Sequence, residues 1–177
     1  SPGIIDDVWM AALRGRTLSI LSQVESELRA GRTQPKLVVA HLPVPHPPVV
    51  FDGSCGERVR DDLSDPVKIS VPHFSGSMTE AMEVQGEQTR CIDNLMSPTL
   101  STVVAADPEA VVIVMSDHGP DTRYNWAAPA NPGLNDRVAC LLAVRTPGLS
   151  GLVPSDVTLV NVMPRLLDAY FGAGLSL

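Results

Sequence analysis

The chain has 177 residues, a length that fits one domain or a large piece of one. Its formal net charge of −7 argues against nucleic-acid binding and against electrostatic capture of anionic lipid, because both need clustered Lys and Arg. The apolar share of 44% and the mean hydropathy of +0.12 are typical of a compact globular chain, and the longest apolar run, 138–144, is far too short for a membrane span.

The N-terminal third predicts one helix, one strand and the start of a long loop. Residues 1–35 are assigned to a helical segment, with an amphipathic helix over 6–29. Its expected buried stripe consists of Val8, Leu18, Leu21, Val24 and Leu28. The β-branched run 36–42 predicts a buried strand. Four prolines between Pro43 and Pro48 then predict an irregular loop over 43–77, because proline removes hydrogen-bond donors and fixes φ.

The rest of the chain alternates helices and apolar strands. A helix is predicted over 79–105, kinked or divided at Pro98, with a buried stripe of Ile92, Leu95, Met96, Val103 and Val104. Strands are predicted over 110–115 and 138–144. A last helix is predicted from Asn161, with Pro164 in its first turn and Gly172 just past its end.

Apolar strands without alternation, separated by helices, predict an α/β fold with a mainly parallel sheet and helices on both faces. We expect a single domain over 1–177. Three widely spaced cysteines, Cys55, Cys91 and Cys140, form no Cys-x-x-Cys pair. They indicate neither a zinc knuckle nor a disulfide framework, so ordinary core or surface thiols are expected.

Two of the predicted strands end in residues that can bind metal, where ligands of a parallel sheet collect. Strand 36–42 leads to His41 and His46, and strand 110–115 leads to Asp117 and His118. Consecutive strand residues point to opposite faces, so Asp117 and His118 can share an ion only if the strand ends before them.

A turn at this point is predicted by Gly119, which tolerates positive φ, and by Pro120, which prevents the strand from resuming. The residues alone leave an alternative open. In that alternative, Asp117 caps nearby amides and His118 is solvated.

Three stretches resemble the sulfatase-like branch of the alkaline phosphatase superfamily, which contains sulfatases, phosphonate monoester hydrolases, lipoteichoic acid synthases and phosphoethanolamine transferases. "VVIVMSDHGPD" (111–121) resembles its metal-ligand motif. "VVAHLPVPHPPVVFD" (38–52) resembles the strand and loop in which a histidine meets the substrate. "SDVTLVNVMPRLLDAYFG" (155–172) is similar to a late strand and helix, although Asn161 and Arg165 stand where Asp and Thr are common.

The resemblance implies an alkaline-phosphatase-like fold and a divalent metal bound by Asp117 and His118. A histidine ligand favours Mn or Zn, with Ca possible. His46 would act in catalysis on the transferring group or leaving oxygen. His41 and Arg123 are candidates for substrate binding, against a core histidine and a surface ion pair as their respective alternatives.

The family pattern also includes an early acidic metal ligand and a Thr, Ser or modified Cys nucleophile, and neither motif precedes Lys36. Cys55 lacks the Cys-x-Pro-x-Arg pattern of modified sulfatase cysteines. The resemblance therefore implies the C-terminal half of a catalytic domain, inactive alone, whose expected partner is the N-terminal half of the same domain.

The expected function is that of a metal-dependent hydrolase or transferase acting on phosphate or sulfate esters, either small-molecule or lipid-linked. His118 favours phosphate, since many sulfatases carry Asn in that position. Relatives with the histidine-proline loop are often bacterial, membrane-tethered proteins with an extracytoplasmic catalytic domain. The alternatives are a non-catalytic α/β binding or interaction module, and an α/β domain with an incidental Asp-His pair.

Overall fold

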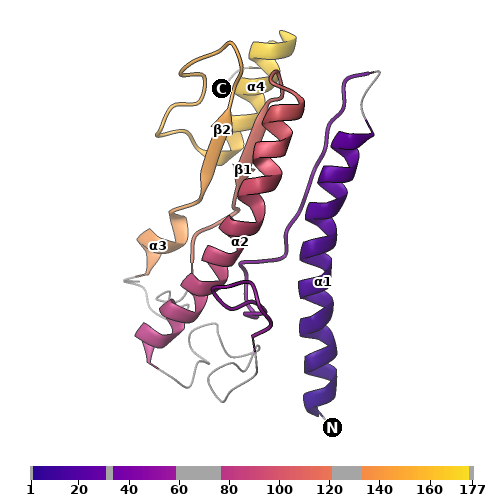
Figure 1. The fold of residues 1–177 in the computed structure, drawn as a ribbon. Coiled ribbons are helices and arrows are strands. Elements are labelled where there is room, and N and C mark those ends of the chain that lie inside the picture. Colours follow the sequence, from indigo (N-terminus) through magenta and orange to yellow (C-terminus); the bar gives the residue numbers. More distant parts are fainter. Residues whose placement is uncertain (1, 31–33, 59–76, 121–132, 176–177) are drawn as a thin grey trace.

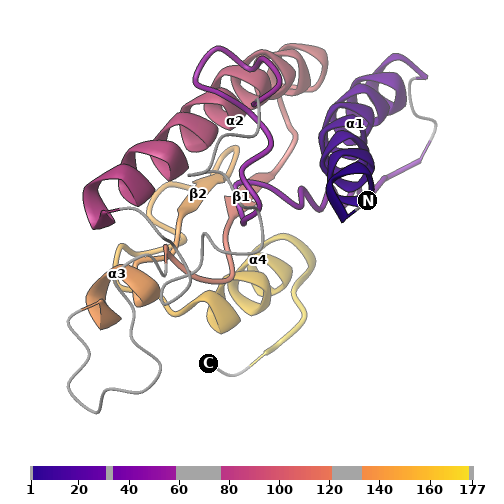
Figure 2. The ribbon, with the colours of Figure 1, turned by 90° about the horizontal axis from the view of Figure 1, so that it is seen from below.

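The computed structural model describes residues 2–30, 34–58, 77–120 and 133–175. The helices of these residues are α1 (Pro2–Arg29), α2 (Met78–Ala106), α3 (Leu134–Val138), the short 3-10 helix η1 (Leu159–Asn161) and α4 (Val162–Phe171). The strands are β1 (Val112–Met115) and β2 (Leu142–Arg145). Helices α1 and α2 pack beside one another, and the sheet lies between α2 and α4 (Figures 1 and 2).

The described residues contain one sheet, in which β1 and β2 pair antiparallel with Val112 opposite Arg145 and Met115 opposite Leu142. The predicted α/β fold with a mainly parallel, alkaline-phosphatase-like sheet is therefore wrong for this structure. The apolar runs were interpreted as strands buried on both faces, yet both strands are only half-buried, and the exposed fraction of Met115 is 47%. Two antiparallel strands can leave one face of their sheet exposed to solvent, whereas a parallel sheet is covered on both faces.

The predicted strand 36–42 is also wrong. This segment runs extended without joining a sheet, and Leu37 and Val39 are 81% and 82% exposed. Lys36 holds its start against α1 through an ion pair with Glu27, in which Nζ lies 2.7 Å from Oε2. The hydrogen bond and charge of Lys36 lower the pKa of the Glu27 carboxyl. β-propensity reflects packing on a half-buried surface, and among the residues that the structure describes none provides such a surface for Leu37 and Val39.

Helix α1 ends at Arg29 as predicted but begins at Pro2, four residues earlier than predicted. Its buried positions are Met10 and Thr17, whereas Val8 and Leu18 are 65% and 43% exposed. The predicted stripe is thus wrong at its N-terminal end, and the remaining members are half-buried: Leu21, Val24 and Leu28. The helix buries a narrow face only, because α2 and the loop after Leu42 contact it on one side.

Helix α2 agrees with its prediction to within a residue at each end. A capping box forms at its start, where the backbone N–H of Ser77 donates to Glu80 Oε2 (2.6 Å) and that of Glu80 donates to Ser77 Oγ (3.3 Å). These two bonds lower the pKa of the Glu80 carboxyl, and they satisfy the backbone N–H groups of Ser77 and Glu80 at the start of the helix. The helix runs without a break through Pro98, so the expected division is wrong. Its predicted stripe packs toward the core at Ile92, Leu95 and Met96.

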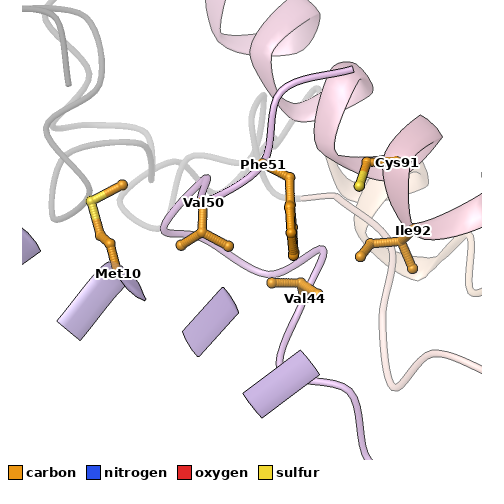
Figure 3. Packing of buried hydrophobic residues seen from close by; sticks show 6 residues of the cluster. All are labelled: Met10, Val44, Val50, Phe51, Cys91 and Ile92. Carbon is orange, nitrogen blue, oxygen red and sulfur yellow. The ribbon is translucent and has the colours of Figure 1, made fainter. Parts of the chain in front are cut away.

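The main core joins α1, the loop and α2, as Figure 3 shows. Its buried members are Met10, Val44, Val50, Phe51, Cys91 and Ile92. Phe51 is fully buried at the centre of this group. The core therefore includes side chains of the proline-rich loop as well as of the two helices.

A disulfide joins Cys55 in the loop to Cys91 in α2, with the two Cα atoms 5.0 Å apart. The prediction of three ordinary thiols is therefore wrong for this pair, while Cys140 is a free cysteine. The odd number and wide spacing of the cysteines gave no sign of the bond, because it depends on two segments that only the folded chain brings together.

The C-terminal helix agrees with its prediction. α4 begins at Val162 after η1, contains Pro164 in its first turn, and ends at Phe171; Gly172 follows as the C-cap, with a left-handed φ of 61°. Across the described parts of the chain, no helix has both the length and the apolar character needed to cross a bilayer.

Candidate functional site

The candidate site begins where β1 ends. Beyond Met115, one more pair of bonds joins the two strand ends, in which Ser116 N–H donates to Leu141 O (3.1 Å) and Leu141 N–H donates to Ser116 Oγ (2.8 Å). The chain then leaves the ladder and turns. The prediction that the strand ends before Asp117 and His118 is confirmed.

Asp117 and His118 point to the same side of this turn. Asp117 Oδ1 accepts the backbone N–H of His118 at 3.0 Å, and Oδ2 lies 3.7 Å from His118 Nε2. The Asp117 side chain is 89% exposed and that of His118 is 30% exposed. The local amide cap and the convergence of the two side chains, which the sequence offered as alternatives, therefore occur together.

The His118 ring has two different neighbours at its second nitrogen. Nδ1 lies 2.7 Å from the Gly119 carbonyl oxygen and 3.2 Å from Arg137 Nη1. A carbonyl only accepts and a guanidinium only donates, so each contact needs a different tautomer. When Nδ1–H donates to Gly119 O, the lone pair of the neutral ring is on Nε2, which lies 3.7 Å from Asp117 Oδ2.

His46 approaches this pair from the proline-rich loop. Its ring centroid lies 6.5 Å from that of His118, with the ring planes inclined by 69°. Its Nδ1 lies 2.6 Å from the Pro47 carbonyl oxygen, so Nε2 is the nitrogen left to act on a bound group. The structure thus brings together two predicted site segments that are far apart in the sequence.

Gln88 of α2 shapes the loop that carries His46, and the sequence interpretation missed it. Its side chain is fully buried. Oε1 accepts the backbone N–H groups of Val50 (2.7 Å) and Phe51 (3.3 Å), while Nε2 donates to Pro45 O (3.1 Å) and faces His46 O at 3.5 Å. The sequence signal for this role is that the glutamine falls on the apolar face of an amphipathic helix, where a polar side chain needs hydrogen-bond partners.

Gly119 is buried where the turn meets α3. Its N–H donates to Arg137 O (2.8 Å), and an added Cβ would collide with Asp136 O and lie 2.7 Å from Ala139 O. The turn does not use the positive φ that a glycine tolerates, since φ of Gly119 is not positive. The glycine is required instead because the backbone of α3 lies too close for any side chain.

We therefore expect Gly119→Ala to lower the free energy of unfolding by about 1–3 kcal/mol or more, because the methyl group must displace backbone atoms. Urea unfolding of the variant and of the wild type measures this. Gly86→Ala is the matched control, because nothing lies within 4 Å of its Cβ position on α2. That change should be neutral or stabilising. Equal stabilities of the two variants would contradict the close approach at Gly119.

The other predicted site residues are not assembled here. His41 is exposed in the extended segment, which overturns its alternative as a core histidine. Arg123 lies outside the described residues. Of the predicted set, the structure therefore groups His46, Asp117 and His118.

Asp117 and His118 fit a divalent cation as two of its ligands. Ions bound at about 2.0–2.2 Å in tetrahedral geometry separate neighbouring donor atoms by roughly 3.4 Å. The 3.7 Å between Nε2 and Oδ2 is close to this separation. Within the described ranges, no group of three or more His, Cys, Asp or Glu side chains is arranged to hold a metal ion.

No family model matches this chain, and neither a curated protein nor a solved structure matches it. The likeness of the three motifs to sulfatase-like enzymes remains a prediction from the sequence. The functional interpretation therefore depends on the geometry around His118.

Proposed function

We propose that this chain supplies part of the metal centre of a hydrolase or transferase that acts on phosphate or sulfate esters. The observation that carries the proposal is the convergence of Asp117 Oδ2 and His118 Nε2 at 3.7 Å on an exposed turn. His46, from a distant segment, adds a second imidazole beside them. An acidic ligand, an imidazole ligand and a further histidine are the groups that metal-assisted ester chemistry uses.

In this proposal Asp117 and His118 hold the cation through Oδ2 and Nε2. Donation from Nδ1–H to Gly119 O (2.7 Å) orients the imidazole and leaves its lone pair on Nε2, the nitrogen 3.7 Å from Asp117 Oδ2. A mixed nitrogen and oxygen donor set favours Mn or Zn, with Ca possible. When bound, the ion would neutralise charge on the transferring group and activate the nucleophile.

His46 acts on the leaving oxygen in this scheme. Its Nδ1–H donates to the Pro47 carbonyl at 2.6 Å, so Nε2 is the nitrogen that meets the leaving oxygen, and it would donate a hydrogen bond or a proton there in the doubly protonated form of the ring. The loop that carries it is fixed by a buried glutamine and a disulfide. A fixed loop keeps the imidazole at a constant distance from the metal ligands, which lowers the entropic cost of reaching the transition state.

Catalytic metal centres use three or more protein ligands, and this proposal assigns two to the described residues. We propose that the remaining ligands and the nucleophile come from the N-terminal half of the same domain. Metal binding, rather than turnover, is therefore the test suited to this chain.

The experiment is calorimetric titration of the 177-residue chain with Mn²⁺ and Zn²⁺. We expect weak binding that falls by about tenfold or more in Asp117→Asn and in His118→Gln, since each removes a ligand atom. Asp93→Asn and His41→Gln are matched controls at exposed positions away from the turn and should leave binding unchanged. Equal binding by all five proteins would refute the assigned ligands and would favour a non-catalytic binding module.

A further inference from the structure

The loop between Pro43 and Pro48 has few hydrogen-bond donors of its own, because proline carries no N–H. Its carbonyl oxygens therefore need donors from elsewhere in the fold. Two side-chain amides of α2 supply them, from positions three residues apart on one face of the helix. Gln85 Nε2 donates to Pro45 O at 2.5 Å, and Gln88 Nε2 donates to the same oxygen at 3.1 Å. Pro45 O thus has a donor for each of its two lone pairs.

We propose that Gln85 is a positioning residue that sets how far His46 lies from the metal ligands of the proposed centre. The inference rests on the proposed function, which assigns His46 to the leaving oxygen. Gln85 reaches the loop at Pro45 O and acts on His46 through the main chain.

The Pro45 carbonyl determines the direction in which the chain enters His46. Its oxygen lies in one plane with N and Cα of His46, because the peptide bond is planar. Two donors from two positions on α2 fix the tilt of this plane, whereas one donor leaves the plane free to turn about its hydrogen bond. Beyond the Cα atom, the imidazole is held by the Pro47 carbonyl, to which Nδ1–H donates at 2.6 Å. The ring is therefore oriented from both sides, and α2 sets the first of them.

Gln85 and Gln88 differ in what else they hold. Gln88 is fully buried and also accepts the backbone N–H groups of Val50 and Phe51, so its loss lowers stability. Gln85 is only half-buried, and among the described residues its side-chain amide bonds to Pro45 O only. Removing that amide should therefore free the peptide plane while stability stays nearly unchanged. The two roles, positioning and stability, are separable at Gln85.

The proposed chemistry is sensitive to such a tilt. The ring centroid of His46 lies 6.5 Å from that of His118, a ligand of the proposed cation. A misplacement of about 1 Å can slow a reaction by roughly a hundredfold. Gln85 therefore affects the action of His46 on the leaving oxygen, although it lies on α2 and not on the turn that carries the metal ligands.

NMR of the metal-free 177-residue chain tests the position of His46. The nuclear Overhauser effect between the carbon-bound ring protons of His46 and His118 falls with the sixth power of their separation. Gln85→Met keeps the length of the side chain and removes the donor, so this effect should fall by about twofold or more, as a shift of about 1 Å would cause. The urea midpoint should stay unchanged, which a merely structural role does not predict.

Two further variants serve as controls in this experiment. Gln85→Lys restores a donor and should keep the wild-type Overhauser effect. Gln23→Met makes the same change at an exposed position of α1 and should alter neither the effect nor the urea midpoint. Equal Overhauser effects in the wild type and Gln85→Met would overturn the inference.

Paramagnetic relaxation by Mn²⁺ then tests the position of His46 relative to the proposed centre. Mn²⁺ should broaden the ring protons of His46 in the wild type, and at equal occupancy Gln85→Met should reduce this broadening by about twofold or more. The calorimetric affinity for Mn²⁺ should be the same in both proteins, because Gln85 contributes no ligand atom in the proposed centre. A changed affinity with unchanged broadening would overturn the inference.

The failure of this inference is distinguishable from that of the proposed function. If no protein binds Mn²⁺ while the Overhauser effect falls in Gln85→Met, the metal assignment fails and the control of His46 by Gln85 stands. If Mn²⁺ binds and neither signal of His46 responds, the role of Gln85 fails and the metal ligands stand. Gln85→Ala, which introduces the residue with the highest helix propensity, replaces Gln85→Met if that variant does not fold.

Discussion

Replacing Cys55 and Cys91 together by serine should lower the free energy of unfolding by about 2–4 kcal/mol. The bond closes a segment of 36 residues, and a covalent link of this span removes conformational entropy from the unfolded chain. It also ties the loop of His46 to α2 beside the main core. Urea unfolding of the oxidised wild type and the double variant, monitored by circular dichroism, gives the difference directly.

The matched control for this prediction is Cys140→Ser, which removes the free thiol and should leave stability within about 0.5 kcal/mol of the wild type. Reduction of the wild type with dithiothreitol should reproduce the loss seen in the double variant. A double variant as stable as the oxidised wild type would show that the core holds the loop without the bond.

Replacing Gln88 by leucine should lower the free energy of unfolding by about 2–4 kcal/mol. The change leaves the buried N–H groups of Val50 and Phe51 without their acceptor, and each such group costs about 1–3 kcal/mol when it is unsatisfied. Leucine also removes the donor to Pro45 O. The loop that carries His46 should therefore loosen together with the fall in stability, which urea unfolding and amide hydrogen exchange at Val50 and Phe51 measure.

Gln23→Leu provides the comparison for this change. Gln23 is exposed on α1 and donates only to Ser19 Oγ, so its replacement should alter stability by less than about 0.5 kcal/mol. Fast exchange at Val50 and Phe51 in both the wild type and Gln88→Leu would contradict a protective role for the buried amide.

The sequence predicted best those elements whose signals are local. The apolar periodicity of 79–105 places α2 to within a residue at each end, and Gly172 lies just past the end of α4, so both helices are predicted closely. The turn after Met115 was predicted for the same reason, because a strand end followed by glycine and proline is a local pattern. Its glycine, however, meets a steric demand from α3 that no local pattern contains.

The failures arise where structure depends on distant partners. The apolar run 36–42 has strand-like composition, but the described residues contain no strand paired with it, so its side chains are exposed. The pairing direction of β1 and β2 depends on how the chain returns between them, which apolar composition does not record. The contact of Arg137 with His118 joins α3 to the turn and is equally invisible in the sequence.

The cross-link between the proline-rich segment and α2 makes the folded form depend on where the chain matures. Thiols of cytosolic proteins are kept reduced by glutathione and thioredoxin, whereas such bonds persist in secreted and periplasmic proteins. Closing the bond releases two protons and passes two electrons to an oxidant such as another protein disulfide. Preparations from reducing and oxidising hosts would therefore differ in how the loop that carries His46 is held to α2.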